Sequence, residues 1–423
     1  MPKHSVSRFL IVLLLFASAC SNAPAPTPTF DLSGLPTVTS APETAIPELS
    51  AALTEPIQPL PTTNIPFEPS GLKVVFNSNG NLWFWSETTP ARQLTSEGDA
   101  GAPKLSDDGN VIVFQRAQML WAIDNDGSNP RQLADIPTFT GHPFLAQFEF
   151  QPNSHIVYFS SRDSVHSTIG LDLHRVNADS PAPQTILQQG GQLTFSPNGA
   201  LLAIAQIDRI YVVRLDTAAP VSVLEFKQVN TNSDWSYYPQ VVWLNDSTGF
   251  YTVIPGAELG EKSRFLYVSA DGSFTAQLAE FVMADLRAGQ PIIAPNGSKV
   301  AYVTQADATL EVHVIDASTA DLTVASHANA PLIGLLAWSP DSARFAYHAG
   351  DPSRLLLTGV NISSMPLLDS FTSHTFTWVD ANRFLYFANG ELRLGQVGNP
   401  LLTVVATGFP DWQGYLGSYD FAP

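Results

Sequence analysis

A short turn motif returns along this chain at a nearly constant interval, and that interval limits the folds open to it. Each copy places a large apolar residue before a turn of Ser, Pro, Asp, Asn or Gly. The residue after the apolar one falls at positions 106, 151, 196, 244, 294, 339 and 379, so the spacings are 45, 45, 48, 50, 45 and 40. This interval is typical of a four-stranded propeller blade. The copies are KLSDDG (Lys104–Gly109), FQPNS (Phe150–Ser154), FSPNG (Phe195–Gly199), WLNDS (Trp243–Ser247), IAPNG (Ile293–Gly297), WSPDS (Trp338–Ser342) and WVDAN (Trp378–Asn382).

The sequence between the turns predicts strands. Each turn is followed by a short apolar run such as VIVF (Val111–Phe114), and then by a second run such as RIYVVRLD (Arg209–Asp216). A further run often starts near an Arg-Gln-Leu element, as in RQLT (Arg92–Thr95) and RQLA (Arg131–Ala134). Runs rich in β-branched and aromatic residues between such turns favour strands. The expected fold class is all-β.

The first copy of the repeat lacks its first strand. KVVF (Lys73–Phe76) and NLWFW (Asn81–Trp85) lead into RQLT without a turn motif before them, whereas Phe421–Pro423 begins another aromatic-x-Pro turn at the C-terminus. We expect the C-terminal strand to complete the first blade, because closing the ring removes exposed sheet edges. The result is an eight-bladed β-propeller, with seven blades as the alternative if the copy at 339 or 379 is degenerate.

The repeat has a recognisable relative. The SPDG-type turn, the apolar-Ala-Tyr/Phe strand after it, the DxDG hairpin (Asp124–Gly127) and the RQLT strand resemble TolB-type, WD-like propeller repeats. The resemblance covers residues 71–423 and implies the fold, but such propellers host many functions. Eight blades is also the number in the dipeptidyl-peptidase-IV family. That family carries an α/β-hydrolase domain, and the GxSxG elbow of such domains is missing from this sequence.

The N-terminus has the layout of a bacterial lipoprotein signal. Lys3 and Arg8 precede an apolar run, Phe9–Phe16, that is too short to span a bilayer stably. Small residues, Ala17–Ala19, come directly before Cys20, the single cysteine of the chain. The resemblance to a lipobox implies cleavage after residue 19 and lipidation of Cys20. The alternative is an ordinary cleaved signal with an incidental cysteine.

A tether is expected to follow, over residues 20–70. Residues 21–70 contain 11 Pro together with many Thr, Ala and Ser. Proline removes backbone donors and favours extended conformations, so this segment is expected to stay disordered. The predicted organisation is a signal peptide (1–19), a lipid-anchored Pro/Thr-rich linker (20–70) and a propeller (71–423). The expected location is extracytoplasmic, on the outer membrane or the outer face of the cytoplasmic membrane.

Charge and cysteine content exclude some kinds of partner and site. The 38 Asp and Glu against 20 Lys and Arg give a net charge of −18. We do not expect nucleic-acid binding, because that depends on cations that neutralise phosphates. One cysteine cannot form an internal disulfide, a Cys-based zinc site or a CxxC pair. No cofactor and no metal site are predicted.

Strand order places the loops from second to third strands and from fourth strands to the next blade on one face, here called the top face. Four long loops come from consecutive blades: residues 136–147, 160–170, 227–240 and 254–264. Their Trp, Tyr and few polar residues are typical of recognition surfaces. The alternative is that these aromatics plug the ring or pack between blades. With one residue of the closing loop, the candidate binding residues are Phe139, His142, Phe144, His166, Trp235, Tyr237, Tyr238, Glu258, Glu261 and Trp412.

The sequence carries no recognisable catalytic motif, since HExxH, Gly-rich phosphate loops and nucleophile elbows are all missing. The Asp and Asn residues of the turns are interpreted as turn formers. We predict a monomeric, non-catalytic binding scaffold for an envelope protein, peptide or glycan. Two alternatives stay open: a propeller hydrolase or lyase with acidic residues in the central funnel, and an accessory subunit of an envelope complex of the Tol kind. Buried Asp, Glu or His with shifted pKa values in the funnel would favour the enzyme.

Overall fold

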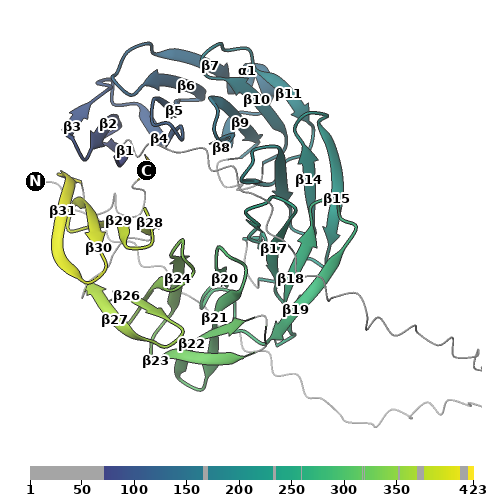
Figure 1. Ribbon diagram of the computed structural model, residues 1–423. Coiled ribbons are helices and arrows are strands. Elements are labelled where there is room, and N and C mark those ends of the chain that lie inside the picture. Colours follow the sequence, from purple (N-terminus) through teal and green to yellow (C-terminus); the bar gives the residue numbers. More distant parts are fainter. Residues whose placement is uncertain are drawn as a thin grey trace, which may run out of the picture. The chain divides into compact units, whose positions relative to one another are not determined.

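The computed structural model describes residues 71–423 except 165–169, 232–234, 259, 317, 319, 351–352, 369–375 and 410–417. They belong to one compact unit, Glu68–Pro423. Its strands form eight four-stranded antiparallel sheets arranged as the blades of a ring (Figure 1). The all-β class and the eight-bladed propeller are confirmed, so the seven-blade alternative does not apply.

Every blade uses its strands in the same way, with the first strand innermost and the fourth outermost (Figure 1). Blades 1 to 4 consist of β32 (Tyr419–Ala422), β1 (Lys73–Ser78), β2 (Asn81–Ser86) and β3 (Thr89–Gln93); β4 (Ala100–Leu105), β5 (Val111–Arg116), β6 (Met119–Asp124) and β7 (Arg131–Asp135); β8 (Phe144–Phe150), β9 (Ile156–Arg162), β10 (Leu173–Asn177) and β11 (Gln184–Leu187); and β12 (Gln192–Phe195), β13 (Leu201–Ala205), β14 (Arg209–Arg214) and β15 (Ala219–Glu225).

Blades 5 to 8 repeat this order. They consist of β16 (Val242–Trp243), β17 (Gly249–Ile254), β18 (Ser263–Ser269) and β19 (Thr275–Phe281); β20 (Ile292–Ile293), β21 (Lys299–Ala306), β22 (Thr309–Asp316) and β23 (Asp321–Ala328); β24 (Ile333–Trp338), β25 (Phe345–Ala349), β26 (Arg354–Gly359) and β27 (Ile362–Leu368); and β28 (Phe376–Trp378), β29 (Arg383–Ala388), β30 (Glu391–Gln396) and β31 (Asn399–Thr407).

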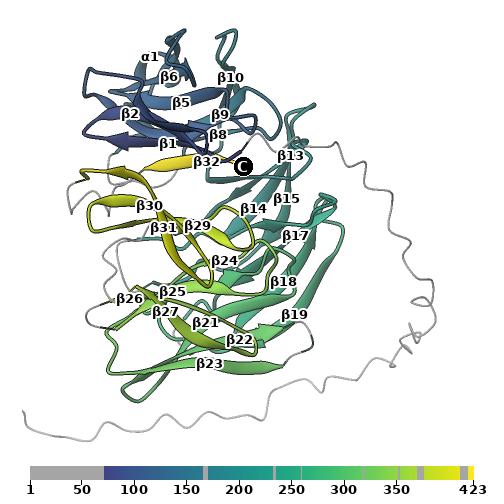
Figure 2. The same cartoon turned by 60° about the vertical axis from the view of Figure 1, so that its left-hand side comes forward.

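The C-terminal strand closes the ring as the sequence predicts. β32 pairs antiparallel with β1, with Lys73 opposite Ala422 and Phe76 opposite Tyr419. Figure 2 shows β32 lying between β1 and the last blade. The first and last blades are therefore joined by a strand from the far end of the chain.

The hydrophobic core lies between adjacent blades. The middle strands are buried on both sides, which explains why β5 reads as an unbroken apolar run in which Val111 to Phe114 are all buried. One cluster joins side chains of β5, β6 and β7 to side chains of β8 and β9. Each blade is thus stabilised by its neighbours more than by its own turns.

The recurring turn residues have structural roles. In the KLSDDG turn (Lys104–Gly109), the Ser106 hydroxyl donates to Asp108 Oδ1 (2.6 Å) and accepts the Val111 N–H (3.0 Å). The Gly109 N–H donates to the Ser106 carbonyl (2.7 Å), and Gly109 has a φ of 66°, which glycine adopts without strain. These contacts support the interpretation of the turn Asp and Asn residues as turn formers.

The large apolar residue before the turn links neighbouring blades when it is Trp. The indole N–H groups donate to a carbonyl of the preceding blade's first strand in each case: Trp243 to Thr194 (3.0 Å), Trp338 to Ile292 (3.1 Å) and Trp378 to Ala337 (3.0 Å). An innermost strand has no sheet partner on its channel side, so these bonds satisfy carbonyls that would otherwise depend on water.

Candidate functional site

A cavity of about 640 Å³ opens where the first strands of blades 4 to 7 begin, at the top-face end of the central channel. Three exposed glutamines, Gln192, Gln240 and Gln290, line it together with Leu335 and Leu336 of β24. The wall therefore offers amide donors and acceptors beside apolar surface, the mixture typical of ligand pockets.

The three predicted aromatics of the 227–240 loop all line this cavity, but they differ in burial. Trp235 is half-buried, whereas Tyr237 is 4% exposed and donates its hydroxyl to the Val253 carbonyl (3.1 Å) within the core of blades 5 and 6. Tyr238 is 8% exposed, and its hydroxyl has no partner among the described residues. Burial raises the pKa of both tyrosines. Of the three, Trp235 is the one with a partly exposed side chain in the cavity, and Tyr237 packs in the core.

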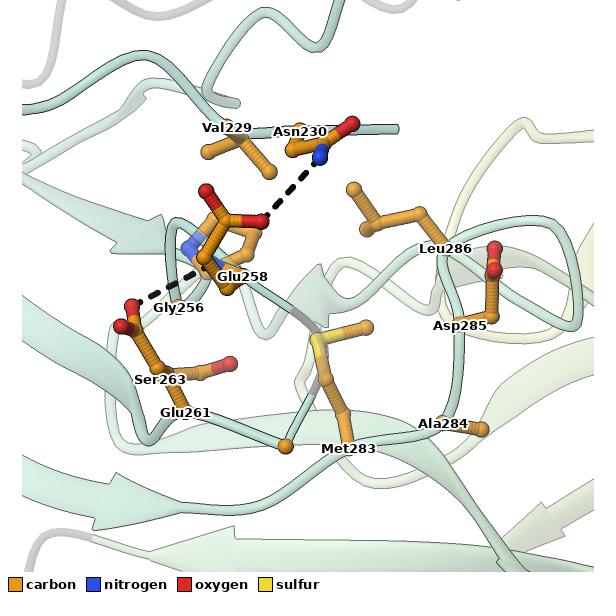
Figure 3. Close-up of a pocket in the computed structure, with 12 residues that line it drawn as sticks. Val229, Asn230, Gly256, Glu258, Glu261, Ser263, Met283, Ala284, Asp285 and Leu286 are labelled. Atoms are coloured by element: carbon orange, nitrogen blue, oxygen red, sulfur yellow. Dashed lines mark hydrogen bonds between the residues drawn. The ribbon is translucent and has the colours of Figure 1, made fainter. Parts of the chain in front are cut away.

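The two predicted glutamates line a second, smaller pocket on the top face (Figure 3). Glu258 and Glu261 belong to the connection between β17 and β18, and the opposite wall comes from the connections before β16 and β20. The Glu258 N–H donates to Glu261 Oε2 (3.2 Å), and Asn230 Nδ2 donates to Glu258 Oε2 (3.1 Å). The loop sequence placed both carboxylates at one opening.

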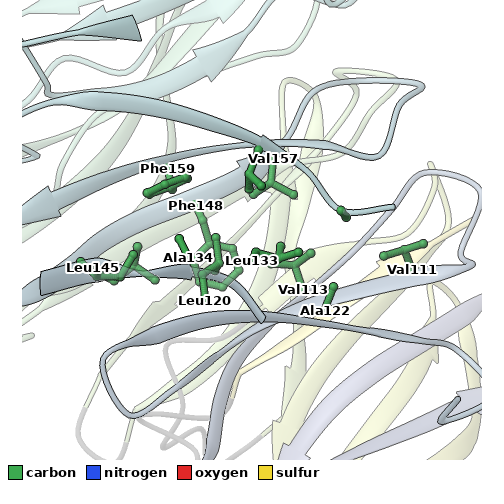
Figure 4. Close-up of a cluster of buried hydrophobic side chains, with 13 residues drawn as sticks. Val111, Val113, Leu120, Ala122, Leu133, Ala134, Leu145, Phe148, Val157 and Phe159 are labelled. Atoms are coloured by element: carbon green, nitrogen blue, oxygen red, sulfur yellow. The ribbon is translucent and has the colours of Figure 1, made fainter. Parts of the chain in front are cut away.

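The predicted residues of the 136–147 loop lie farther around the ring. Phe139 belongs to α1 (Ile136–Thr140). The centroid of its ring lies 5.2 Å from the ring centroid of His174 and 6.2 Å from that of Phe159. It packs against the cluster between blades 2 and 3 that Figure 4 shows. His142 and Phe144 are half-buried as well, and of these three residues it is Phe139 that matches the packing alternative.

Sequence reasoning missed a buried polar network at the base of the 160–170 loop. Asp172 accepts the Ser161 N–H at Oδ1 (2.7 Å) and the Ser161 hydroxyl at Oδ2 (2.5 Å). His174 Nε2 lies 2.8 Å from Asp172 Oδ2, although off hydrogen-bond alignment. All three residues are at most 3% exposed. Burial would raise the pKa of Asp172, but the close His174 and the Ser161 hydrogen bonds outweigh it and hold that pKa below its usual value.

This network does not have the order of a hydrolytic triad. The carboxylate lies between the serine and the histidine, whereas nucleophilic catalysis needs the base to contact the hydroxyl. No spacing signal could have revealed it, because Ser161 and Asp172 meet only after β9 and β10 pair.

A charged group lines the channel at the ring closure, beside a cavity of about 280 Å³. Lys104 Nζ lies 2.8 Å from Glu149 Oε1, and Asp420 Oδ2 accepts the Leu105 N–H (2.8 Å). Burial raises the pKa of Asp420 to about 6; Lys104 and the Leu105 N–H oppose that rise, and Glu149 adds to it. The raised pKa of Asp420 arises where the two ends of the propeller meet, and no local sequence pattern indicates it.

Three predicted residues, Cys20, His166 and Trp412, lie outside the described residues. In the part of the chain that the structure describes, no helix is long and apolar enough to cross a membrane. Within the same part, no three His, Cys, Asp or Glu side chains gather as a metal site would require.

Comparisons with known proteins identify the fold. No protein-family model and no curated protein match the chain. A solved eukaryotic initiation factor matches with 12% identity and a TM-score of 0.52, over 80% of this chain and 85% of that one. Dipeptidyl peptidase 4 from Porphyromonas gingivalis matches with 12% identity and a TM-score of 0.52, over 73% of this chain and 53% of that one, so this chain spans about half of the peptidase.

A TolB protein is also among the matching structures. TolB from Acinetobacter baumannii has 14% identity and a TM-score of 0.34, over 60% of this chain and 63% of that one. At such identities the matches describe a shared propeller fold and leave the function to the site.

Proposed function

We propose that this protein is an extracytoplasmic, lipid-anchored propeller that acts as a non-catalytic binding scaffold for a protein segment of the cell envelope. The carrying observation is the cavity of about 640 Å³ at the top-face end of the channel. Residues of four consecutive blades and their connections line it, so a ligand there would contact more than one loop.

The chemistry of the cavity fits a polypeptide. The amides of Gln192 and Gln290 can each pair with a backbone N–H or C=O group. The Gln240 oxygen already accepts the Ile293 N–H (3.1 Å), which leaves the Gln240 NH₂ group as a donor. Trp235 and the two leucines supply apolar contact. A Trp in such a place is a frequent source of binding energy. The net charge of −18 favours a basic partner over an acidic one.

One observation favours the enzyme alternative. Asp420 is a carboxyl with a pKa of about 6 beside Lys104 and Glu149, and a proton donor near neutral pH is what hydrolases and lyases use. Its Oδ2, however, already accepts the Leu105 N–H and joins the closing strand to blade 2. A structural role accounts for the group without catalysis, so we favour the scaffold.

The binding proposal predicts a loss on removing one indole. Immobilised Trp235→Ala protein is expected to recover at least about tenfold less of a specific partner from solubilised envelope extract than wild type, as for a hot-spot tryptophan. Phe274→Ala is the matched control, because Phe274 is 57% exposed in the β18–β19 connection on the opposite face. Equal recovery by wild type and Trp235→Ala contradicts the proposal. Partner recovery that survives protease treatment of the extract assigns the site to a glycan instead.

The membrane anchor is a separate proposal with its own test. Cells grown with radiolabelled palmitate are expected to label the wild-type protein and to leave Cys20→Ser unlabelled, because the thiol of Cys20 is the expected attachment point. Ser21→Ala, one residue away, is expected to keep the label. Label retained by Cys20→Ser rules out lipidation at this cysteine.

A further inference from the structure

We infer that the small top-face pocket at Glu258 and Glu261 binds a primary ammonium group carried on an alkyl chain, such as a lysine side chain of the bound partner. The inference deepens the proposed scaffold function and rests on it, since it names the chemistry of one contact. The pocket lies between the connections β15–β16, β17–β18 and β19–β20, so it adjoins the loop that supplies Trp235.

The carboxylates of the pocket differ in whether a cation lies close to them. Asp285 lies 2.8 Å from the Arg287 guanidinium, and Glu258 Oε1 lies 3.7 Å from Lys227 Nζ. Glu261 has no cation within 4.0 Å among the described residues and accepts only the Glu258 N–H. One negative charge at the opening is therefore uncompensated, and a cation placed there would be attracted by both glutamates.

A buried hydroxyl in the pocket wall supplies an independent sign of a ligand. Ser263 is 0% exposed, and its hydroxyl has no hydrogen-bond partner among the described residues. Figure 3 shows the side chain on the pocket side of β18, beside Glu261 and facing Met283. A buried polar atom without a partner is unfavourable, so a donor bound in the pocket would satisfy it.

The volume and the apolar lining of the pocket fit an alkylammonium group. The pocket is small, with a volume of about 30 Å³, which is enough for an ammonium head. Val229, Met283 and Leu286 are buried side chains of the lining and offer apolar contact to methylene groups. An ammonium has three donors, which matches two carboxylates and one hydroxyl acceptor.

Lys227 gives the chain its own competitor for this site. Its ammonium already lies 3.7 Å from Glu258 Oε1, yet its side chain is 70% exposed, so it is held loosely at the rim. An external ammonium that reaches the pocket would displace it. Lys227→Ala is therefore expected to strengthen binding of an added amine rather than weaken it.

Binding of an amine in this pocket can be followed by NMR through the signals of the methionine methyl groups. The full chain is labelled with methyl-¹³C methionine, in which Met283 lines the pocket while Met119 in β6 and Met365 in β27 lie elsewhere. Addition of n-butylammonium chloride is expected to shift the Met283 methyl signal saturably and to leave the signals of Met119 and Met365 unchanged. Met283→Leu assigns the signal. n-Butanol, which has the same length and no charge, is expected to cause at least tenfold weaker shifts.

Glutamine variants test whether the two glutamates bind the ammonium group. Glu258→Gln with Glu261→Gln is expected to weaken the butylammonium response at least tenfold, and Glu280→Gln, a carboxylate paired with Lys262 on the same blade, is expected to leave it unchanged. Two further probes distinguish the sources of the ammonium group. If Nα-acetyl-lysine methylamide shifts the Met283 signal and alaninamide does not, the ligand is a lysine side chain. If alaninamide shifts it and the lysine derivative does not, the ligand is a chain N-terminus. Equal shifts by butanol and butylammonium, or none by either, overturn the ammonium site. That result leaves the Trp235 recovery experiment standing, so the two failures are distinguishable.

Discussion

Removal of residues 418–423 is expected to abolish cooperative folding of the propeller, or to lower its free energy of unfolding by more than about 5 kcal/mol. These six residues hold three blades together. The Tyr419 hydroxyl donates to the Leu385 carbonyl (2.9 Å) and accepts from the Thr377 hydroxyl (3.0 Å), both in blade 8. Asp420 accepts from the Leu105 N–H of blade 2, and β32 pairs with β1 of blade 1. Loss of β32 would also leave β1 as an exposed edge.

Thermal unfolding followed by circular dichroism measures this effect. Deletion of Pro423 alone is the matched control, because Pro423 is exposed and lies outside the β32 pairing. A synthetic peptide of residues 418–423 is expected to restore part of the lost stability by adding a strand in trans. A truncated protein that melts within a few degrees of wild type would show that the closure contributes little.

The fold was predictable because each blade repeats the same local chemistry. The spacing of the turns located the first strands, and the incomplete first copy located the closure at Phe421–Pro423. Even so, the motif did not reveal that its Trp residues bond to the preceding blade, because that contact joins residues more than 40 positions apart.

The candidate site was predictable only in part, because loop residues follow no period. Trp235, Tyr237 and Tyr238 stand almost side by side in the sequence, yet Tyr237 turns into the core while Trp235 lines the cavity. The glutamines of the wall come from three different blades and carry no local signal. The raised pKa of Asp420 likewise arises from burial at a seam formed by the two ends of the propeller.

Asp172→Asn is expected to lower the free energy of unfolding at neutral pH by about 3 kcal/mol, because it removes a buried charge that several groups depend on. The amide cannot accept both the N–H and the hydroxyl of Ser161 at its two ends, and it no longer attracts His174. Asp307→Asn is the matched control. Asp307 is exposed with a φ of 52°, which asparagine tolerates, so its stability is expected to stay unchanged.

The pH dependence separates this charge effect from simple loss of packing. The pKa of Asp172 is lowered in the folded protein, so its contribution is fully present above the unfolded-state pKa of about 3.9 and is lost as pH falls through the folded pKa. Chemical denaturation at a series of pH values is therefore expected to show the gap between wild type and Asp172→Asn shrinking below about pH 4. A gap that stays constant down to the lowest pH would mean that shape, and not the carboxylate charge, stabilises the hairpin of β9 and β10.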